Sequence, residues 1–106
     1  MIARLWHGRT HAERSDAYLG YLLETGIPEY RATPGNQGVQ ILRRIEGDVA
    51  HFLLISYWES FEAIARFAGD ALETARYYPR DAEFLLELEP KVVHYEVALD
   101  RAAVSG

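Results

Sequence analysis

The chain has 106 residues and no cysteine, which excludes disulfides, thiolate nucleophiles and cysteine-based zinc sites. Its share of hydrophobic residues, 49%, is typical of folded proteins, and we expect a single domain over 1–106. The net charge of −5 argues against nucleic acid as a partner, because neutralising phosphate charge supplies most of that affinity. No apolar run is long enough to span a membrane, and a cysteine-free chain suits the cytoplasm, where we expect the protein.

The first third of the chain predicts one strand and one helix. Residues 2–9 have the composition of a strand, and Thr10 and Glu13 have the spacing of a capping box at the start of a helix. The predicted helix has one apolar side, which consists of Tyr18, Leu19, Leu22 and Leu23. We expect Gly26 and Pro28 to end or kink this helix.

A loop at 34–38 leads into a predicted hairpin. Apolar and polar residues alternate over 39–46, and Gly47 with Asp48 provides the tight turn. Residues 49–58 then form the most apolar predicted strand. Because the side chains of a strand point alternately to its two faces, both faces of this strand need cover.

Ser60 predicts the N-cap of a second helix. The apolar stripe of that helix consists of Phe61, Ile64, Ala65 and Ala68. We expect Gly69 to close it, a short extra helix over 70–78, and a last strand over 91–99. The tail from Asp100 is expected to fray.

These elements follow the order β-α-β-β-α-β, which predicts an α+β fold with both helices on one side of an antiparallel sheet. The other face of the sheet then has no cover within the chain. The strand over 49–58 contributes to that face Val49, Leu53, Ile55 and Tyr57. Because soluble monomers seldom expose a large continuous apolar patch, we expect a homodimer that buries it by two-fold symmetry.

Four segments together resemble the antibiotic-biosynthesis-monooxygenase family. They are Trp6 to Thr10, the loop at 34–38, Tyr57 to Phe67, and Val93 to Val97. The resemblance covers a core of about residues 2–99, and the junction at Trp58, Glu59 and Ser60 is its most specific part. It implies a ferredoxin-like fold with a four-stranded sheet, helices on one face, and two chains paired into a dimeric α/β barrel.

Two branches of this family suggest the chemistry. The haem-degrading branch has a Trp in the second helix and a haem-ligating His after it, where this chain has Phe67 and Tyr77. The branch that oxidises polyketide phenols without metal or flavin has an Asn four residues before the Trp, where this chain has Leu54. We therefore expect no haem, other cofactor or metal. The resemblance implies a cofactor-independent monooxygenase-like protein that acts on a small aromatic or polyketide-like molecule.

The candidate site combines a proton acceptor with aromatic side chains. Such an oxygenase must bury a phenolic substrate and take a proton from it, and histidine titrates in a suitable range. His94 and His7 are the candidate catalytic residues, although strand histidines also occur as half-buried structural residues. Four arginines are candidates for neutralising an anionic substrate, or are surface charges, namely Arg4, Arg43, Arg44 and Arg76. The candidate substrate-binding residues, each of which also suits a core, are Trp58, Trp6, Tyr18, Phe67 and Tyr78.

Two further functions remain open from the sequence. A non-catalytic dimeric module, which binds a small molecule or responds to stress, needs only an apolar cavity on the same fold. An oxygenase needs in addition a His or Tyr within reach of its substrate. The third possibility is a haem-binding protein that uses Tyr77 or a histidine.

Overall fold

The computed structural model describes residues 1–101 and contains one antiparallel sheet in the order β2-β3-β1-β4. Its strands are β1 (Ile2–His11), β2 (Asn36–Glu46), β3 (Val49–Trp58) and β4 (Val93–Glu96). The predicted α+β, ferredoxin-like fold with a four-stranded antiparallel sheet is confirmed. The tail expected to fray lies mostly outside the described residues.

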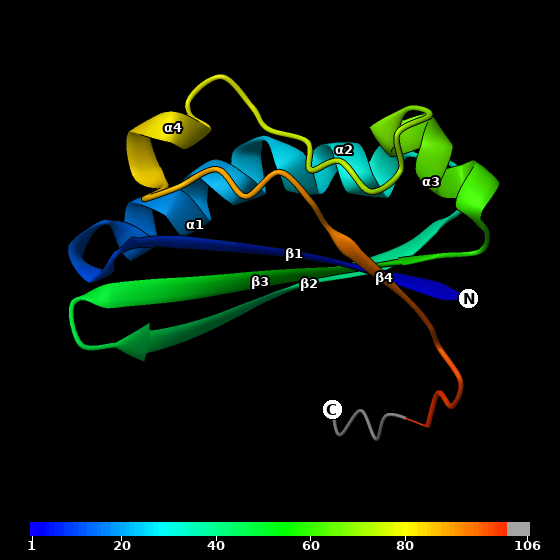
Figure 1. Ribbon diagram of the computed structural model, residues 1–106, viewed down its shortest axis with the longest axis horizontal. Coiled ribbons are helices and arrows are strands. Elements are labelled where there is room, and N and C mark those ends of the chain that lie inside the picture. Colours follow the sequence, from blue (N-terminus) through cyan, green and yellow to red (C-terminus); the bar gives the residue numbers. More distant parts are fainter. Residues whose placement is uncertain (102–106) are drawn as a thin grey trace.

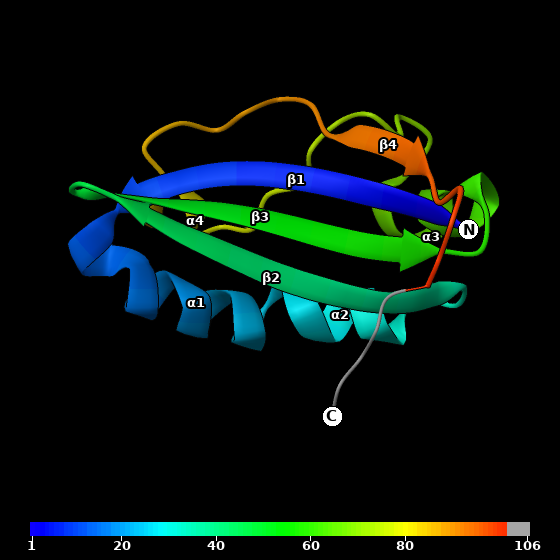
Figure 2. The same cartoon turned by 90° about the horizontal axis from the view of Figure 1, so that it is seen from below.

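The helices all lie on one side of this sheet (Figure 1). They are α1 (Ser15–Glu24), α2 (Gly26–Ala32), α3 (Phe61–Ala68) and α4 (Asp81–Phe84), with a short 3-10 turn, η1 (Ala12–Arg14), before α1. The first two lie in line along β2, and Figure 2 shows the sheet from its uncovered side. No helix within residues 1–101 is long and apolar enough to cross a membrane.

The alternation along β3 decides which residues form the core. The strand begins and ends where the sequence predicts, after a turn in which Gly47 adopts a φ of +61° that glycine tolerates best. Every second residue of β3 faces the helices and is buried, namely Ala50, Phe52, Leu54, Ser56 and Trp58. Across the sheet, Trp6 of β1 pairs with Leu54, so both side chains point into the same core.

The predicted capping box at Thr10 and Glu13 is wrong. The first strand continues through Thr10 to His11, and the Thr10 hydroxyl donates to the His11 carbonyl instead of capping a helix. Pairing with β3 extends over this segment, with Thr10 opposite Ala50, so the sheet takes the residues that a cap would need. The Ser60 cap is confirmed, because its hydroxyl accepts a hydrogen bond from the Ala63 amide at 3.1 Å.

The extra helix expected over 70–78 is also absent from the described chain, and the short helix α4 begins instead at Asp81. Residues 73–75 are extended instead and form backbone hydrogen bonds with residues 90–92, just before β4. The Val92 amide donates to the Glu73 carbonyl at 2.8 Å, and the Ala75 amide donates to the Pro90 carbonyl at 2.9 Å. These long-range backbone bonds replace the local bonds of a helix. The last strand is correspondingly shorter than predicted.

Two predicted apolar helix faces are shifted in the structure. On α1 the buried aromatic positions are Tyr18 and Tyr21, whereas Leu23 is 54% exposed. On α3 the buried positions are Ala63, Ile64 and Phe67, whereas Phe61 is 49% exposed. Each helix is therefore rotated about its axis from the orientation that the sequence predicts. The break between α1 and α2 at Thr25 fits the expected kink near Gly26.

The sheet face away from the helices is apolar at its centre. We call it the open face. Its central apolar side chains are Leu5, Leu42, Leu53, Ile55, Tyr57, Val93 and Tyr95. Val93 is 52% and Tyr95 58% exposed in the single chain, and no described residue of the chain covers them.

Replacing Trp58 would show how much the stability of the core depends on one aromatic side chain. The sequence predicts that Trp58→Ala impairs ligand binding more than folding. In the structure, however, the indole is fully buried, its Nε1 donates to Ser56 Oγ at 2.9 Å, and its ring lies 5.8 Å from that of Phe67. We expect Trp58→Ala to lower the free energy of unfolding by roughly 3–5 kcal/mol, measured by urea denaturation. A loss below about 1 kcal/mol with abolished ligand binding would restore the pocket role.

Candidate active site

A cavity lies between the sheet and the helices, and its walls are mainly aromatic. The aromatic side chains that line it are Trp6, Tyr18, Tyr30, Tyr77 and Tyr78. Three charged residues, Arg4, Arg76 and Asp81, complete the lining. The free space within it is about 20 Å³, which is room for about one water molecule. Side chains therefore fill most of this partly open cavity.

Asp81 is the carboxylate of the cavity. It is only 4% exposed, and its oxygens accept hydrogen bonds from the Tyr18 hydroxyl at 3.3 Å and from the Tyr78 amide at 2.5 Å. Burial raises the pKa of Asp81, while these two hydrogen bonds partly oppose that shift. Burial and the neighbouring Asp81 likewise raise the pKa of Tyr18, so the pair shares one proton, which resides on the phenol. Asp81 is thus placed to accept a proton inside the cavity.

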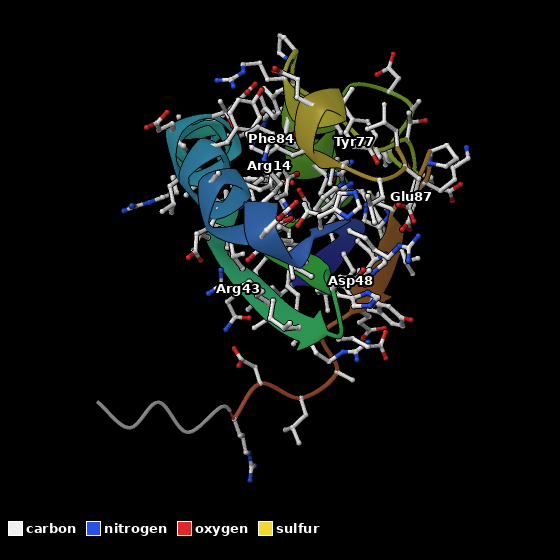
Figure 3. All side chains as sticks on the ribbon, turned by 90° about the vertical axis from the view of Figure 1, so that its left-hand side faces the viewer. Arg14, Arg43, Asp48, Tyr77, Phe84 and Glu87 are labelled. Atoms are coloured by element: carbon white, nitrogen blue, oxygen red, sulfur yellow. The ribbon has the colours of Figure 1, made fainter. Side chains whose placement is uncertain are left out.

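The ring of Trp6 is held by a chain of hydrogen bonds. Its Nε1 donates to the Tyr77 hydroxyl at 3.2 Å, and that hydroxyl donates to the Glu89 carbonyl at 2.5 Å. The two rings meet edge to face with their centres 6.2 Å apart. Figure 3 shows Tyr77 on the helix side of the strands. This arrangement fixes one aromatic wall.

The two arginines of the cavity differ in their surroundings. Arg76 is partly exposed, forms an ion pair with Glu29, and donates to the Phe67 carbonyl at 2.8 Å. Arg4 is only 2% exposed and donates from Nη2 to the Thr74 carbonyl at 3.0 Å. Arg4 forms no ion pair with a carboxylate among the described residues.

His94 lies beside the cavity without lining it. It pairs with Arg4 across β4 and β1, so the two side chains are neighbours on the helix side of the sheet. Burial lowers the pKa of His94, and the nearby Arg4 guanidinium lowers it further. Its ring meets that of Phe61 edge to face at 5.7 Å. His94 is therefore a neutral imidazole at neutral pH.

His7 lies on the open face, on the opposite side of the sheet from the cavity. Its Nδ1 is 2.6 Å from a Glu89 oxygen, and its Nε2 is 3.2 Å from Nδ1 of His51. The other ring nitrogen of His51 is 3.1 Å from a Glu46 oxygen. The result is a hydrogen-bonded row of two imidazoles between two carboxylates. Because the sheet separates this row from the cavity, His7 and His94 cannot act on the same ligand from within one chain.

The structure thus divides the predicted site residues into three groups. Trp6, Tyr18 and Tyr78 line the cavity, as expected of substrate-binding residues. Trp58 and Phe67 lie behind its wall in the core, and the two histidines lie outside it. Their roles in binding and catalysis stay predictions. Within residues 1–101, no cluster of three or more His, Asp or Glu side chains is arranged to hold a metal ion.

Sequence reasoning missed Asp81 and Tyr30. Nothing near Asp81 in the sequence indicates burial, because the Tyr18 hydroxyl that it binds is 63 positions away. Tyr30 follows a proline and a glycine in a segment that predicts the end of a helix. A signal did exist for Arg4, since it shares the inward parity of Trp6 on a strand.

Comparisons with known proteins identify the fold. No protein-family model and no curated protein matches the chain. Among solved structures, a putative antibiotic biosynthesis monooxygenase from Bacillus cereus is 16% identical, with 99% of this chain and 98% of that chain covered and a TM-score of 0.66. A putative antibiotic biosynthesis monooxygenase from Nitrosomonas europaea is 19% identical over 91% and 97%, with a TM-score of 0.64.

The heme-degrader MhuD from Mycobacterium tuberculosis, with two hemes bound in its active site, is 21% identical over 96% of this chain and 100% of that chain, with a TM-score of 0.60. Identities this low establish a shared fold and leave activity open. The family resemblance seen in the sequence is confirmed at that level: the chain has the fold of the antibiotic biosynthesis monooxygenase proteins.

Proposed function

We propose that the protein is a cofactor-independent oxygenase that binds a flat phenolic molecule in the cavity between sheet and helices. The observation that carries the proposal is the buried pair of Asp81 and Tyr18 in an aromatic-lined cavity. A cytoplasmic location, expected from the cysteine-free sequence, is part of the proposal. Burying a carboxylate costs free energy, which the hydrogen bonds from the Tyr18 hydroxyl and the Tyr78 amide offset only in part.

The reaction needs a base and a shielded site. A phenol loses its hydroxyl proton to Asp81, and the electron-rich ring then reacts with O₂. One oxygen atom becomes the second carbonyl oxygen of a quinone. The other leaves as water with the hydrogen atoms of the broken O–H and C–H bonds, so the substrate supplies all four electrons. The aromatic walls exclude bulk water during these steps.

Binding requires the cavity to widen, because its free space holds about one water molecule. The wall formed by residues 76–78 belongs to no helix or strand, so its displacement breaks few backbone hydrogen bonds. Tyr77 and Tyr78 both lie on that wall. A flat ligand would take their place against Trp6 and Tyr18. A non-catalytic binding module would explain the aromatic walls but not Asp81, so we favour the oxygenase.

We also propose that two copies pair through their open faces. The exposed apolar centre of that face, with Val93 and Tyr95 more than half exposed, supports this partner. In a pair related by two-fold symmetry, the open face of one copy contacts the open face of the other, and both apolar centres are buried.

The cavity residues do not fit haem, which MhuD binds. No histidine lines the cavity. The Tyr77 hydroxyl, which stands near the position of the ligating histidine in that branch, is engaged by Trp6 and the Glu89 carbonyl.

Replacing Asp81 tests the proposed base. We expect Asp81→Asn to lower kcat for quinone formation at least about 100-fold, because it keeps the shape and removes the base. Oxygen consumption and quinone absorbance with a panel of hydroxynaphthalenes measure the rate. Glu83→Gln, on an exposed residue of the same helix, is the matched control. His94→Ala and His7→Ala are measured in the same way. If either lowers kcat more than Asp81→Asn does, that histidine is the base and Asp81 is not.

The pH profile follows from the same residue. Burial raises the pKa of Asp81, and only the ionised carboxylate accepts a proton. Activity should therefore be full above this raised pKa and fall as the pH drops through it, at a higher pH than an ordinary Asp would give. In Asp81→Asn that limb should vanish from the profile of kcat/KM. An unchanged limb in the variant would assign it to another group.

We also predict that haem is neither bound tightly nor degraded, because no histidine among the described residues lines the cavity. On titration with haem at micromolar concentration, the Soret band should stay at the position of free haem, with a known haem-binding protein as the positive control. A stoichiometric Soret shift, followed by loss of the band under a reductant, would contradict the prediction and restore haem degradation.

The dimer is tested on the open face. Ile55 lies in the middle of this face, opposite Leu5. We expect light scattering to give the mass of two chains for the wild type, and of one folded chain for Ile55→Glu. Leu23→Glu is the control, since Leu23 is 54% exposed on α1, away from the sheet. A wild-type mass of one chain at every concentration would rule the pairing out.

A further inference from the structure

We propose that Arg4 forms an anion subsite at one end of the cavity, so that the ligand carries a carboxylate in addition to its aromatic ring. This inference rests on the proposed function, because both concern the same cavity, and it adds the class of substrate. It starts from a guanidinium that is buried without a counter-ion.

The hydrogen bonding of Arg4 is incomplete. The side chain is almost fully buried, its Nη2 donates to the Thr74 carbonyl at 3.0 Å, and the Tyr30 phenol is a second polar neighbour of the guanidinium. Its Nε has no hydrogen-bond partner within residues 1–101. A guanidinium carries five N–H donors in a planar fork that matches the two oxygens of a carboxylate. Arg4 therefore has donors free inside the protein.

The charge of Arg4 is not neutralised by its neighbours. Burial lowers the pKa of Arg4, the Tyr30 phenol opposes this shift, and the second cation, Arg76, adds to it. The ring of Phe67, 5.6 Å from the guanidinium carbon, offers only a weak attraction. No carboxylate of the described chain pairs with it, and His94 beside it is neutral.

Arg76 shows that an arginine of this cavity can have an ion-pair partner within the chain, which Arg4 lacks among the described residues. Both arginines line the cavity, and the one at the more exposed position has Glu29 as its ion-pair partner. The deeply buried one, for which a counter-ion matters more, has none. An anion that enters with the ligand would supply it.

The two charged ends of the cavity lie apart. Arg4 is near the start of β1, whereas Asp81 begins α4 toward the other end of the sheet (Figure 1). Arg4 is not among the groups that shift the pKa of Asp81. Once widened, the cavity would fit a molecule with a carboxylate at one end, an aromatic ring between, and a hydroxyl group at the other.

One experiment uses a small carboxylate, which needs far less widening of the cavity than an aromatic ligand does. Sodium formate is compared with sodium chloride at equal concentration by thermal denaturation of the wild type, Arg4→Met and Arg66→Met. Arg66 is an exposed arginine of α3 and serves as the control for lost surface charge. We expect formate to raise Tm by roughly 5 °C at ten times its dissociation constant in the wild type and in Arg66→Met. In Arg4→Met the rise should be absent, and an equal rise there would overturn the subsite.

A second experiment compares two flat probes that differ in charge, 2-naphthoate and 2-naphthamide, by calorimetric titration. The wild type should bind 2-naphthoate roughly 10- to 100-fold more tightly. Arg4→Met should bind both equally, with unchanged affinity for the amide. Equal affinities in the wild type would overturn the anion subsite but leave flat-ligand binding intact. If neither probe binds while formate still acts through Arg4, the proposed function fails and the subsite stands.

A conservative variant protects the test against misfolding. Arg4→Lys keeps the positive charge and loses the planar fork. Its affinity for 2-naphthoate should therefore be lower than that of the wild type for 2-naphthoate and higher than that of the wild type for 2-naphthamide. If Arg4→Met does not fold, the affinity of Arg4→Lys for 2-naphthoate tests whether Arg4 binds the carboxylate. An affinity for 2-naphthoate equal to that of the wild type would then overturn the role of Arg4.

Discussion

The period-two alternation of β1 and β3 is the constraint on which the rest of the molecule depends. It sends Trp6, Leu54 and Trp58 to the helices and Leu5 and Ile55 to the open face. A slip of one residue in the pairing would exchange the two sets. Because this pairing is continuous from Ile2 to His11, the floor of the cavity and the apolar open face are fixed together.

The inward set of this alternation also contains a charge. Arg4 takes the same parity as Trp6, so the sheet itself carries the guanidinium into the protein. Asp81 comes from α4, on the layer above the sheet, and is held by Tyr18 and Tyr78. The two opposite charges therefore come from different layers and do not neutralise each other. Such separation leaves both free for a ligand, at a cost in stability that the aromatic core offsets.

The open face also carries the hydrogen-bonded row of Glu89, His7, His51 and Glu46. The carboxylates of Glu89 and Glu46 lie at the two ends of the row, and the inner nitrogens of His7 and His51 are 3.2 Å apart, within hydrogen-bond distance. The hydrogen bonds from His51 and Arg44 lower the pKa of Glu46, which keeps that carboxylate ionised. This row sits at one edge of the apolar centre, so it gives the open face a polar border.

The sequence by itself determined those features that depend on neighbours along the chain. These include the bounds of β3, the turn at Gly47, the Ser60 cap, the order of elements and the aromatic identity of three cavity residues. Only the tertiary structure decided what depends on distant partners. Residues 70–78 lose their predicted helix to pairing with residues near β4, and Asp81 becomes buried through a tyrosine 63 positions away. Local patterns report propensity, whereas burial and pairing are set by which segments the sheet brings together.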